Sequence, residues 1–195
     1  IRNASTEYYQ GDGNSGLYIW GAQLEANTTF PTSYIPTTTS AVTRSPDIAT
    51  IEGTNFSSWY NQSEGTVFVE FQAYSVLNPT GSQQVAGFTA GVSNSYRWGV
   101  WNNQLYVAES GPQYFSSLTA STSPTKTVFA VSSNDAIGAS NGILTAQDTT
   151  VVLPVVDNFH IGRTAAGANL LNGHISRLAY YPQRLTDSQL QNLTK

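Results

Sequence analysis

The feature that most constrains the fold of this chain is a hydrophobic pattern that repeats at every second residue. In the segment 66–73, Val67, Val69 and Phe71 alternate with other residues. Because successive side chains of a β-strand point to opposite faces, this alternation predicts a strand with one buried and one polar face. Shorter β runs also lie at 104–109, 127–132, 142–145 and 158–162.

Turn-forming residues separate these runs. Loops are indicated by the Asn, Pro, Gly and Ser residues at 78–81, 110–112 and 140–142. The segment 101–104 is typical of a tight hairpin, because its two central asparagines tolerate the positive φ angles of such turns. Many short strands separated by turns predict an all-β fold in which two antiparallel sheets pack as a sandwich.

A short helix is expected at the C-terminus, where Thr186 and Gln189 have the spacing of a capping box. Leu185 and Leu190 occupy the positions of a hydrophobic staple around this helix start. Leu190 and Leu193 are three residues apart and share one face of the helix. The pattern predicts a helix that closes the β domain.

The first 44 residues differ in composition from the rest of the chain. The segment 17–24 is an apolar run, and 27–45 is rich in Thr and Pro without a regular period. We therefore expect 1–44 to form a strand and an extended connector, and 45–195 to form the sandwich. The absence of Met favours a processed protein or a part of a longer one. The apolar strand then either docks on the sandwich or belongs to a preceding domain.

The composition excludes several classes of site and partner. Without Cys, the chain has no disulfide, no thiol nucleophile and no zinc–thiolate site. Its net charge of −4 provides no basic surface for nucleic acid or for an anionic membrane. No run approaches the roughly 18 apolar residues of a membrane-spanning helix. We therefore expect neither nucleic acid binding nor membrane insertion.

The segment 173–190 resembles the last strand and closing helix of laminin-G-like and concanavalin A-like jelly rolls. Its order is a Gly, an apolar residue, two polar residues, an apolar run that ends in Tyr, and a Leu-Thr helix start. This resemblance implies a jelly-roll sandwich. Ile175 and Leu178 are three residues apart, so both can face the core only if a β-bulge lies at Ser176 and Arg177.

The segments 17–25, 33–37 and 41–44 resemble a region of bacteriophage tail and tail-fibre proteins that leads into a laminin-G-like sandwich. This resemblance implies a virion protein outside the cell, with other phage tail domains and further copies of the chain, a homo-oligomer, as partners. Many relatives carry an acidic pair where this chain has Ser176 and Arg177. No cofactor is therefore expected, although a structural calcium stays open.

Catalytic motifs are weak in this sequence. Polysaccharide hydrolases on this fold carry Glu-x-Asp-x-x-Glu on one strand, and no such cluster occurs here, so Glu70 is interpreted as a solvated carboxylate. The Gly-x-Ser-x-Gly at 138–142 is interpreted as a hairpin turn, because a nucleophile elbow needs a helix after it. The glycine spacing at 162–167 suits a phosphate loop but lacks the Lys-Ser/Thr that follows. His160 and His174 are interpreted as structural, and we expect neither an enzyme nor a metal site.

Aromatic residues are the remaining candidates for binding. Sugar rings stack on Trp and Tyr, while their hydroxyls need amide, Arg or carboxylate partners. Strand alternation puts Tyr96 and Trp98 on one face, and Arg97 and Trp101 on the other. Core packing is the alternative role for any of these aromatics. The candidate ligand-binding residues are Tyr96, Arg97, Trp98, Trp101, Asn103, Tyr106, Tyr114 and Trp59.

Three functions follow from these patterns. The leading hypothesis is a non-catalytic, lectin-like carbohydrate-binding module that recognises a host-surface glycan or polysaccharide as part of a phage tail protein. The first alternative is a structural or assembly spacer of the tail, whose aromatics fill the core or an interface. The second alternative is a polysaccharide hydrolase with carboxylates scattered along the chain.

Overall fold

The computed structural model describes residues 12–26, 31–45, 47–74, 82–90, 94–101, 104–109 and 122–195 of the chain. For 94–101 and 104–109 it describes the backbone alone. The chain divides into two compact units, Ile1–Ser45 and Pro46–Lys195.

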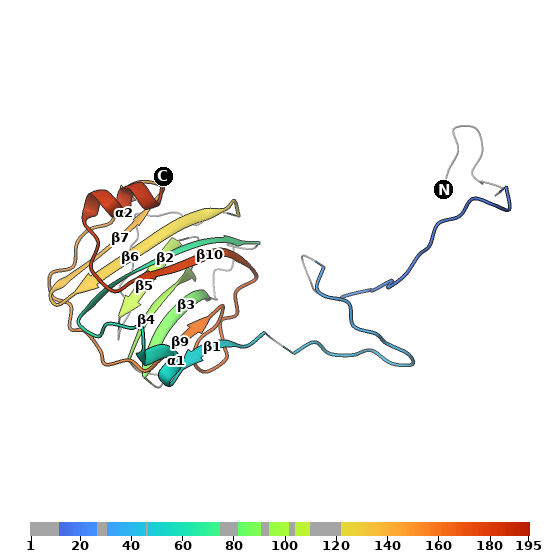
Figure 1. The fold of residues 1–195 in the computed structure, drawn as a ribbon, viewed down its shortest axis with the longest axis horizontal. Coiled ribbons are helices and arrows are strands. Elements are labelled where there is room, and N and C mark those ends of the chain that lie inside the picture. Colours follow the sequence, from blue (N-terminus) through green and yellow to red (C-terminus); the bar gives the residue numbers. More distant parts are fainter. Residues whose placement is uncertain are drawn as a thin grey trace. The chain divides into compact units, whose positions relative to one another are not determined.

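The unit Pro46–Lys195 contains two antiparallel sheets that form a sandwich (Figure 1). The first sheet, in spatial order, consists of β1 (Ala49–Glu52), β9 (Asn158–Ile161), β3 (Ser82–Ala90), β4 (Asn94–Trp101) and β5 (Gln104–Glu109). The second consists of β10 (Gly173–Tyr181), β2 (Glu64–Ala73), β6 (Thr125–Ser132), β7 (Asp135–Ser140) and β8 (Ile143–Leu144). A single helical turn, α1 (Thr54–Ser57), follows β1, and α2 (Asp187–Leu193) follows β10. The predicted all-β sandwich with a short C-terminal helix is confirmed.

The main core lies between the two sheets. Val67, Val69 and Phe71 from β2 belong to the same buried cluster as Phe88 from β3 and Phe159 from β9. The inward face predicted for the segment 66–73 is therefore confirmed. Burial of these side chains stabilises the sandwich by roughly 1.5–3 kcal/mol for each large apolar side chain.

The other face of β2 is buried at Thr66 and Phe68, so the expectation of a polar, solvated face is wrong there, while Glu70 and Gln72 on the same face are partly exposed. Phe68 is 2% exposed and belongs to a second cluster with Leu185 and Leu190. The Thr66 hydroxyl is also buried and donates to the carbonyl of Gln183 at 2.8 Å. Figure 1 shows why: α2 lies against the outer side of the second sheet and covers these positions.

The irregularity predicted in the last strand is present. The pairing of β10 with β2 shifts register between Ile175 and Arg177. As a result, both Ile175 and Leu178 pack against the main core, although they are three residues apart. The predicted β-bulge at Ser176 and Arg177 is thus confirmed.

The closing helix begins as expected. The Thr186 hydroxyl accepts a hydrogen bond from the Gln189 backbone, and the Gln189 side chain accepts one from the Thr186 backbone at 2.8 Å. Leu190, at the buried face, is fully enclosed. The capping box of the sequence is confirmed. In the described part of the chain, no helix is long and apolar enough to span a membrane.

Two predicted turns are also confirmed by the strand register. Trp101 at the end of β4 pairs with Gln104 at the start of β5, which is the pairing of a two-residue hairpin. Between β7 and β8, Asn141 and Gly142 have φ angles of 51° and 76°. The Gly-x-Ser-x-Gly pattern there forms a hairpin turn followed by a strand.

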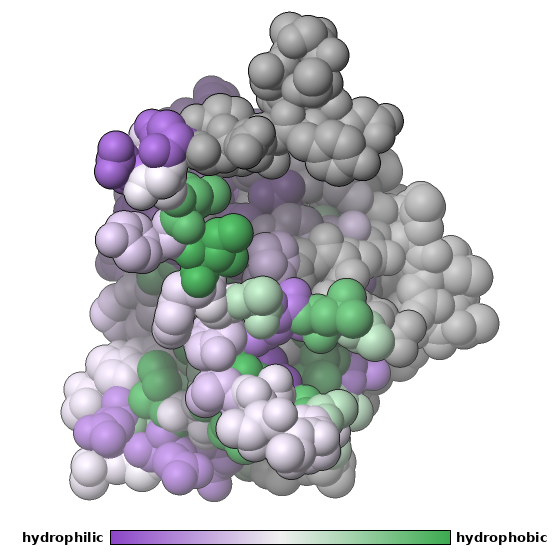
Figure 2. All heavy atoms as spheres, turned by 90° about the vertical axis from the view of Figure 1, so that its right-hand side faces the viewer, coloured by the Kyte–Doolittle hydropathy of each residue, from purple (hydrophilic) through white to green (hydrophobic). Residues whose placement is uncertain are grey.

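The unit Ile1–Ser45 contains no assigned strand within 12–26 and 31–45, although the sequence predicts one at 17–24. The segments are instead joined by side chains: Gln23 Oε1 accepts from the Ile35 backbone at 2.7 Å, and Glu25 accepts from the Thr32 backbone at 3.1 Å. Several large apolar residues are exposed, among them Ile19 and Trp20. Figure 2 shows green, hydrophobic residues at the protein surface beside purple ones. A strand without a pairing neighbour leaves its backbone groups to water, which explains the difference.

Candidate functional site

The first sheet has a polar side that faces away from the second sheet, which we call the outer face. Phe88 and Phe159 point into the core, so their strand neighbours Thr89 and His160 lie on this outer face. On β3 the register shifts between Gln84 and Ala86, and Val85 and Ala86 both enter the core. Among the described residues, the outer face includes Thr50, Gln84, Gly87, Thr89, Asn158 and His160.

Three polar side chains of the outer face are buried, whereas Thr50 and Asn158 on the same face are partly exposed. Gln84 is 0% exposed, His160 is 7% exposed, and Thr89 is also buried. Thr89 donates its hydroxyl hydrogen to Asn158 Oδ1 at 2.6 Å. A buried sheet face is normally filled with apolar side chains, whose burial is favourable without partners. A buried polar face therefore points to a role other than packing.

His160 has a defined environment on this face. Its Nδ1 lies 3.2 Å from the hydroxyl of Thr50 on the neighbouring strand. Burial lowers the pKa of His160, the positive charge of Arg163 lowers it further, and the charge of Glu52 opposes the change. The imidazole is thus held in its neutral form more firmly than an exposed histidine.

Arg163 is held by a small hairpin at residues 162–171. The Leu171 backbone donates to Gly162 at 2.8 Å, and Gly162 in turn donates to Val85 of β3 at 2.8 Å. The Gln84 backbone donates to Asn169 at 2.8 Å, which fixes the hairpin beside β3. No helix follows these glycines, in agreement with the rejection of a phosphate loop. The hairpin thereby brings Arg163 next to the outer face.

Three polar atoms at this place have no hydrogen-bond partner among the described residues: Nε2 and Oε1 of Gln84 and Nε of Arg163. More than nine in ten buried polar groups in folded proteins are paired. Each unpaired group costs about 1–3 kcal/mol. The structure therefore contains unused donors and an unused acceptor on one side of the sheet.

The predicted aromatic residues of β4 take positions on both sides of the same sheet. The register sets Tyr96 opposite Phe88 and Trp98 opposite Ala86, and both of these partners belong to the core. It sets Arg97 opposite Gly87, in the same row as His160. Directly paired residues share a face, so the position of Arg97 lies on the outer face.

The other candidates fall in different places. Along β4, Trp101 lies an even number of residues from Arg97 and so has an outer-face position, and Tyr106 on β5 pairs with Gly99. Asn103 and Tyr114 lie outside the described residues. The roles given to all these residues stay predictions.

Trp59 is partly buried in an aromatic group between the sheets. Its ring lies 4.9 Å from that of Tyr180 and 5.2 Å from that of Phe56, both in edge-on arrangements. Its indole nitrogen donates to the carbonyl of Asn55 at 2.5 Å. The structure thus gives this side chain core contacts, and its predicted role as a sugar platform stays a prediction.

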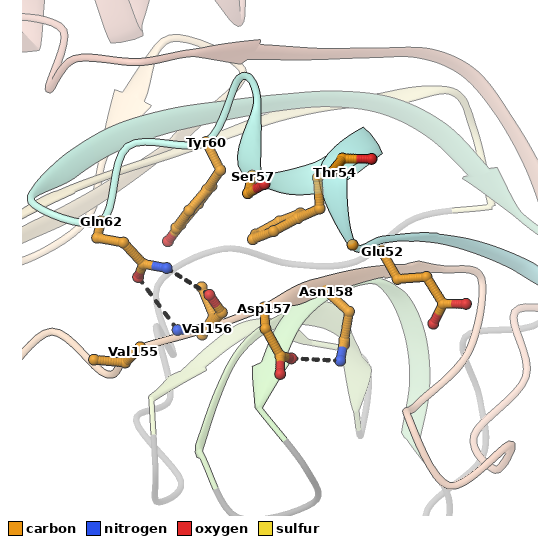
Figure 3. Close-up of a pocket in the computed structure, with 11 residues that line it drawn as sticks. Glu52, Thr54, Ser57, Tyr60, Gln62, Val155, Val156, Asp157 and Asn158 are labelled. Atoms are coloured by element: carbon orange, nitrogen blue, oxygen red, sulfur yellow. Dashed lines mark hydrogen bonds between the residues drawn. The ribbon is translucent and has the colours of Figure 1, made fainter.

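A separate open pocket of about 910 Å³ lies near α1, between β1 and the segment that leads into β9 (Figure 3). The Gln62 amide there donates to the Val156 carbonyl at 2.5 Å and accepts from the Val156 backbone at 3.2 Å. Asn158 donates to Asp157 at 2.7 Å, as Figure 3 also shows. These amides are already paired within the protein, in contrast to the amide of Gln84.

Charge clusters give no further candidate among the described residues. They contain no group of three His, Asp or Glu side chains that could hold a metal ion. Glu70 pairs in register with Lys126 and Arg177 rather than with another acid. His174 lies 2.7 Å from the hydroxyl of Tyr74. Sequence reasoning missed Gln84 and Arg163, because neither carries a motif and only strand pairing brings them together.

Comparisons with known proteins identify the fold. The sequence matches no protein-family model and no curated protein. The structure is similar to CBM40 of the Ruminococcus gnavus IT-sialidase bound to α2,3 sialyllactose, with a TM-score of 0.59 and 14% identity, covering 77% of this chain and 94% of that chain. The same CBM40 bound to α2,6 sialyllactose matches with a TM-score of 0.55 and 15% identity, over the same shares of both chains.

A larger protein also contains this fold. Trypanosoma rangeli sialidase in complex with sialic acid matches with a TM-score of 0.53 and 19% identity, covering 68% of this chain. The match spans only 23% of that chain. At these identities the likeness concerns the fold, and residues 46–195 therefore have the β-sandwich fold that is also found in these carbohydrate-binding modules.

Proposed function

We propose that this β-sandwich is a non-catalytic carbohydrate-binding module whose glycan ligand lies on the outer face of the first sheet. The observation that carries the proposal is the buried polar character of that face, with the unpaired amide of Gln84. Sugars offer many hydroxyl groups, and each requires a polar partner when water is removed. The fold shared with sialyllactose-bound CBM40 structures supports the same proposal.

The predicted residues of β4 extend this site along the sheet. The outer-face positions of Arg97 and Trp101 lie in the strand next to Gln84 and Gly87. A sugar ring stacks on an aromatic ring such as that of Trp. Its hydroxyls bond with amides and with a guanidinium such as that of Arg. We propose that these positions contact further sugar units of the same glycan.

A binding assay tests the proposal directly. A glycan array followed by titration calorimetry should detect binding of at least one glycan by the full chain. Replacing Trp101, whose position lies on the outer face, with Ala should weaken that binding about fivefold or more, because a lost stacking contact costs about 1 kcal/mol or more beyond the lost area. Trp20→Ala, in the unit Ile1–Ser45, is the matched control and should leave affinity unchanged. Absence of binding to every glycan would overturn the proposal.

The cellular setting belongs to the same proposal. The resemblance of 17–25, 33–37 and 41–44 to phage tail proteins supports a place in a virion, where the module would recognise a glycan of the host surface. The similar structures named above are carbohydrate-binding modules and a sialidase, so this setting rests on the sequence resemblance alone. Detection of the chain in purified phage particles by mass spectrometry tests this setting.

An assembly role is the second candidate, and the exposed apolar residues of the unit Ile1–Ser45 favour it. Leu17, Ile19 and Trp20 are largely exposed, which is costly unless another surface covers them. An assembly module should form an oligomer in light scattering and bind no glycan. A hydrolase, by contrast, should release reducing sugar and lose that activity in Glu70 or Glu109 variants.

A further inference from the structure

We propose that the open pocket near α1 is a second binding site, separate from the site on the outer face, and that it takes an amino sugar with a free ammonium group. This pocket, which we call the edge pocket, has a volume of about 910 Å³. Pockets that bind small molecules commonly measure about 300–1,000 Å³, so a sugar unit fits within it. The inference goes beyond the proposed function, because it does not depend on a glycan at the outer face.

The edge pocket has an aromatic wall and a backbone wall. Phe56 and Tyr60 stack with their ring centroids 4.7 Å apart, and Figure 3 shows the Tyr60 ring extending from the α1 side into the space between the two walls. On the other side, the Val156 backbone is bound by both polar groups of the Gln62 amide. Contacts within the protein hold both walls, so the pocket is formed without a ligand.

Several polar groups that line the edge pocket have no hydrogen-bond partner among the described residues. They are the carboxylate of Glu52 and the hydroxyls of Thr54, Ser57 and Tyr60. Burial first, and then the charge of Tyr180, raise the pKa of Tyr60, so its hydroxyl keeps its proton and can donate it. A sugar offers an apolar C–H face to the aromatic wall and hydroxyls to these polar groups.

The charge of the edge pocket indicates the class of sugar. Glu52 and Asp157 line it, and no Lys, Arg or His does so among the described residues. Neither carboxylate forms an ion pair within the described part of the chain, although Asp157 accepts a hydrogen bond from the Asn158 amide at 2.7 Å. These charges repel an acidic ligand. An ammonium group supplies the counter-charge that they need once water is displaced.

Strand pairing brings the two carboxylates to one part of the pocket. Glu52 of β1 pairs with Asn158 of β9, and Asp157 directly precedes Asn158. Figure 3 shows the ends of all three side chains below α1 in the view. Asn158 also accepts from the Thr89 hydroxyl at 2.6 Å, so it lies at the border between the edge pocket and the outer face. An ammonium group has three N–H donors and can therefore bond with more than one of these acceptors.

Matched oligosaccharides test the ligand class on the full chain. Titration calorimetry at about pH 5.5, where carboxylates are ionised, compares a glucosamine tetramer with an N-acetylglucosamine tetramer and with cellotetraose. The glucosamine tetramer, which carries ammonium groups, should bind about fivefold tighter than the other two sugars. Added salt should reduce this preference, because it screens the charges. Equal affinity for the three sugars overturns the inference.

Removal of the carboxylates locates the site. Glu52→Gln should lower the preference for the glucosamine tetramer, and the further change Asp157→Asn should reduce it to less than twofold. Both residues are exposed, so the variants should melt with the wild type. Glu70→Gln on the second sheet is the matched control for net charge and should keep the preference, because Glu70 does not line the edge pocket. An unchanged preference in the double variant overturns the inference.

Two further ligands separate an amino sugar from other cations. Tetralysine should bind more weakly than the glucosamine tetramer, because it lacks the ring hydroxyls. If it binds equally tightly, the pocket takes any ammonium group and the sugar as ligand is overturned. Calcium chloride that raises the melting temperature of the wild type, but not of the double variant, shows a metal site and overturns the inference as well.

Trp101→Ala distinguishes the edge pocket from the site of the proposed function. Because the position of Trp101 lies on the outer face, this variant should keep the wild-type affinity for the glucosamine tetramer. A loss of that affinity overturns the edge pocket as the site. If the glucosamine tetramer binds and depends on Glu52, while no glycan depends on Trp101, the outer-face site fails and the present inference stands.

Discussion

Gly173 and Gln72 are so close that only a glycine fits at the start of the last strand. A Cβ on Gly173 would lie 2.0 Å from the carbonyl oxygen of Gln72 and 2.9 Å from the Cα of Ala73. Gly173 is the first residue of β10 and pairs with Ala73 of β2. The glycine that opens the jelly-roll-like closing segment thus allows the two strands to meet.

Replacement of this glycine should destabilise the sandwich. In Gly173→Ala, the added methyl group meets backbone atoms, which cannot rotate away as a side chain can. We expect a loss of about 3 kcal/mol in the free energy of unfolding, measured by urea denaturation. Gly16→Ala is the control, because a Cβ there meets nothing within 4 Å. Equal stability of the two variants would contradict the close approach.

The ion pair of Arg184 with Asp135 should couple the last segment to the second sheet. Arg184 Nε lies 2.9 Å from Asp135 Oδ2, and the Arg184 side chain is 15% exposed. Arg184→Met keeps the aliphatic stem and should cost about 2 kcal/mol, the scale of a hydrogen bond to a charged group. In a double-mutant cycle with Asp135→Asn the two losses should not add. Strict additivity would show that the pair contributes nothing.

The capping box should contribute measurably to α2. Thr186→Ala removes the hydroxyl that accepts from the Gln189 backbone. We expect a loss of about 1 kcal/mol in thermal or urea unfolding, as for other N-cap substitutions. Ser188→Ala, at an exposed position of the same helix, should change stability by less than about 0.5 kcal/mol. A similar loss in both variants would refute a specific cap.

His160 should make stability depend on pH below neutrality. Burial first, and then the charge of Arg163, lower its pKa in the folded chain, against a smaller opposing effect of Glu52. The unfolded histidine titrates near a pKa of about 6.5, so on acidification the unfolded state binds the proton first. The free energy of unfolding should therefore fall as pH drops below about 6.5, until the folded pKa is passed.

The comparison that isolates this effect is His160→Gln. Urea unfolding at several pH values between 7 and 5 should show a smaller loss of stability in this variant than in the wild type. Identical pH dependence of the two proteins would show that His160 does not titrate differently on folding.

Much of the fold follows from local patterns in the sequence. Alternation identified Val67 and Val69 as core residues, and the three-residue spacing of Ile175 and Leu178 required a bulge. Local patterns also misled: Phe68 occupies the face expected to be polar, because α2 covers it from a distant part of the chain. Whether the second face of a strand is buried depends on which element packs against that face, and the residues of the strand alone do not determine this.

The candidate site was less predictable than the fold. Aromatic content pointed to β4, and the register puts the positions of Arg97 and Trp101 on the outer face. Neither Gln84 nor Arg163 was recognisable, because a glutamine in a strand and an arginine in a loop are ordinary surface residues. What distinguishes them is that enclosed polar atoms of both side chains have no hydrogen-bond partner, which depends on the tertiary structure.

The amino-acid sequence by itself determined the strand periodicity, the turns and the helix cap, because these depend on residues that are close along the chain. The tertiary structure alone decided that β9 pairs with β3 and that the 162–171 hairpin bonds to Gln84. Such long-range pairing depends on the combined packing of both sheets rather than on any local pattern. This pairing buries Gln84, Thr89 and His160, which local periodicity would leave in water.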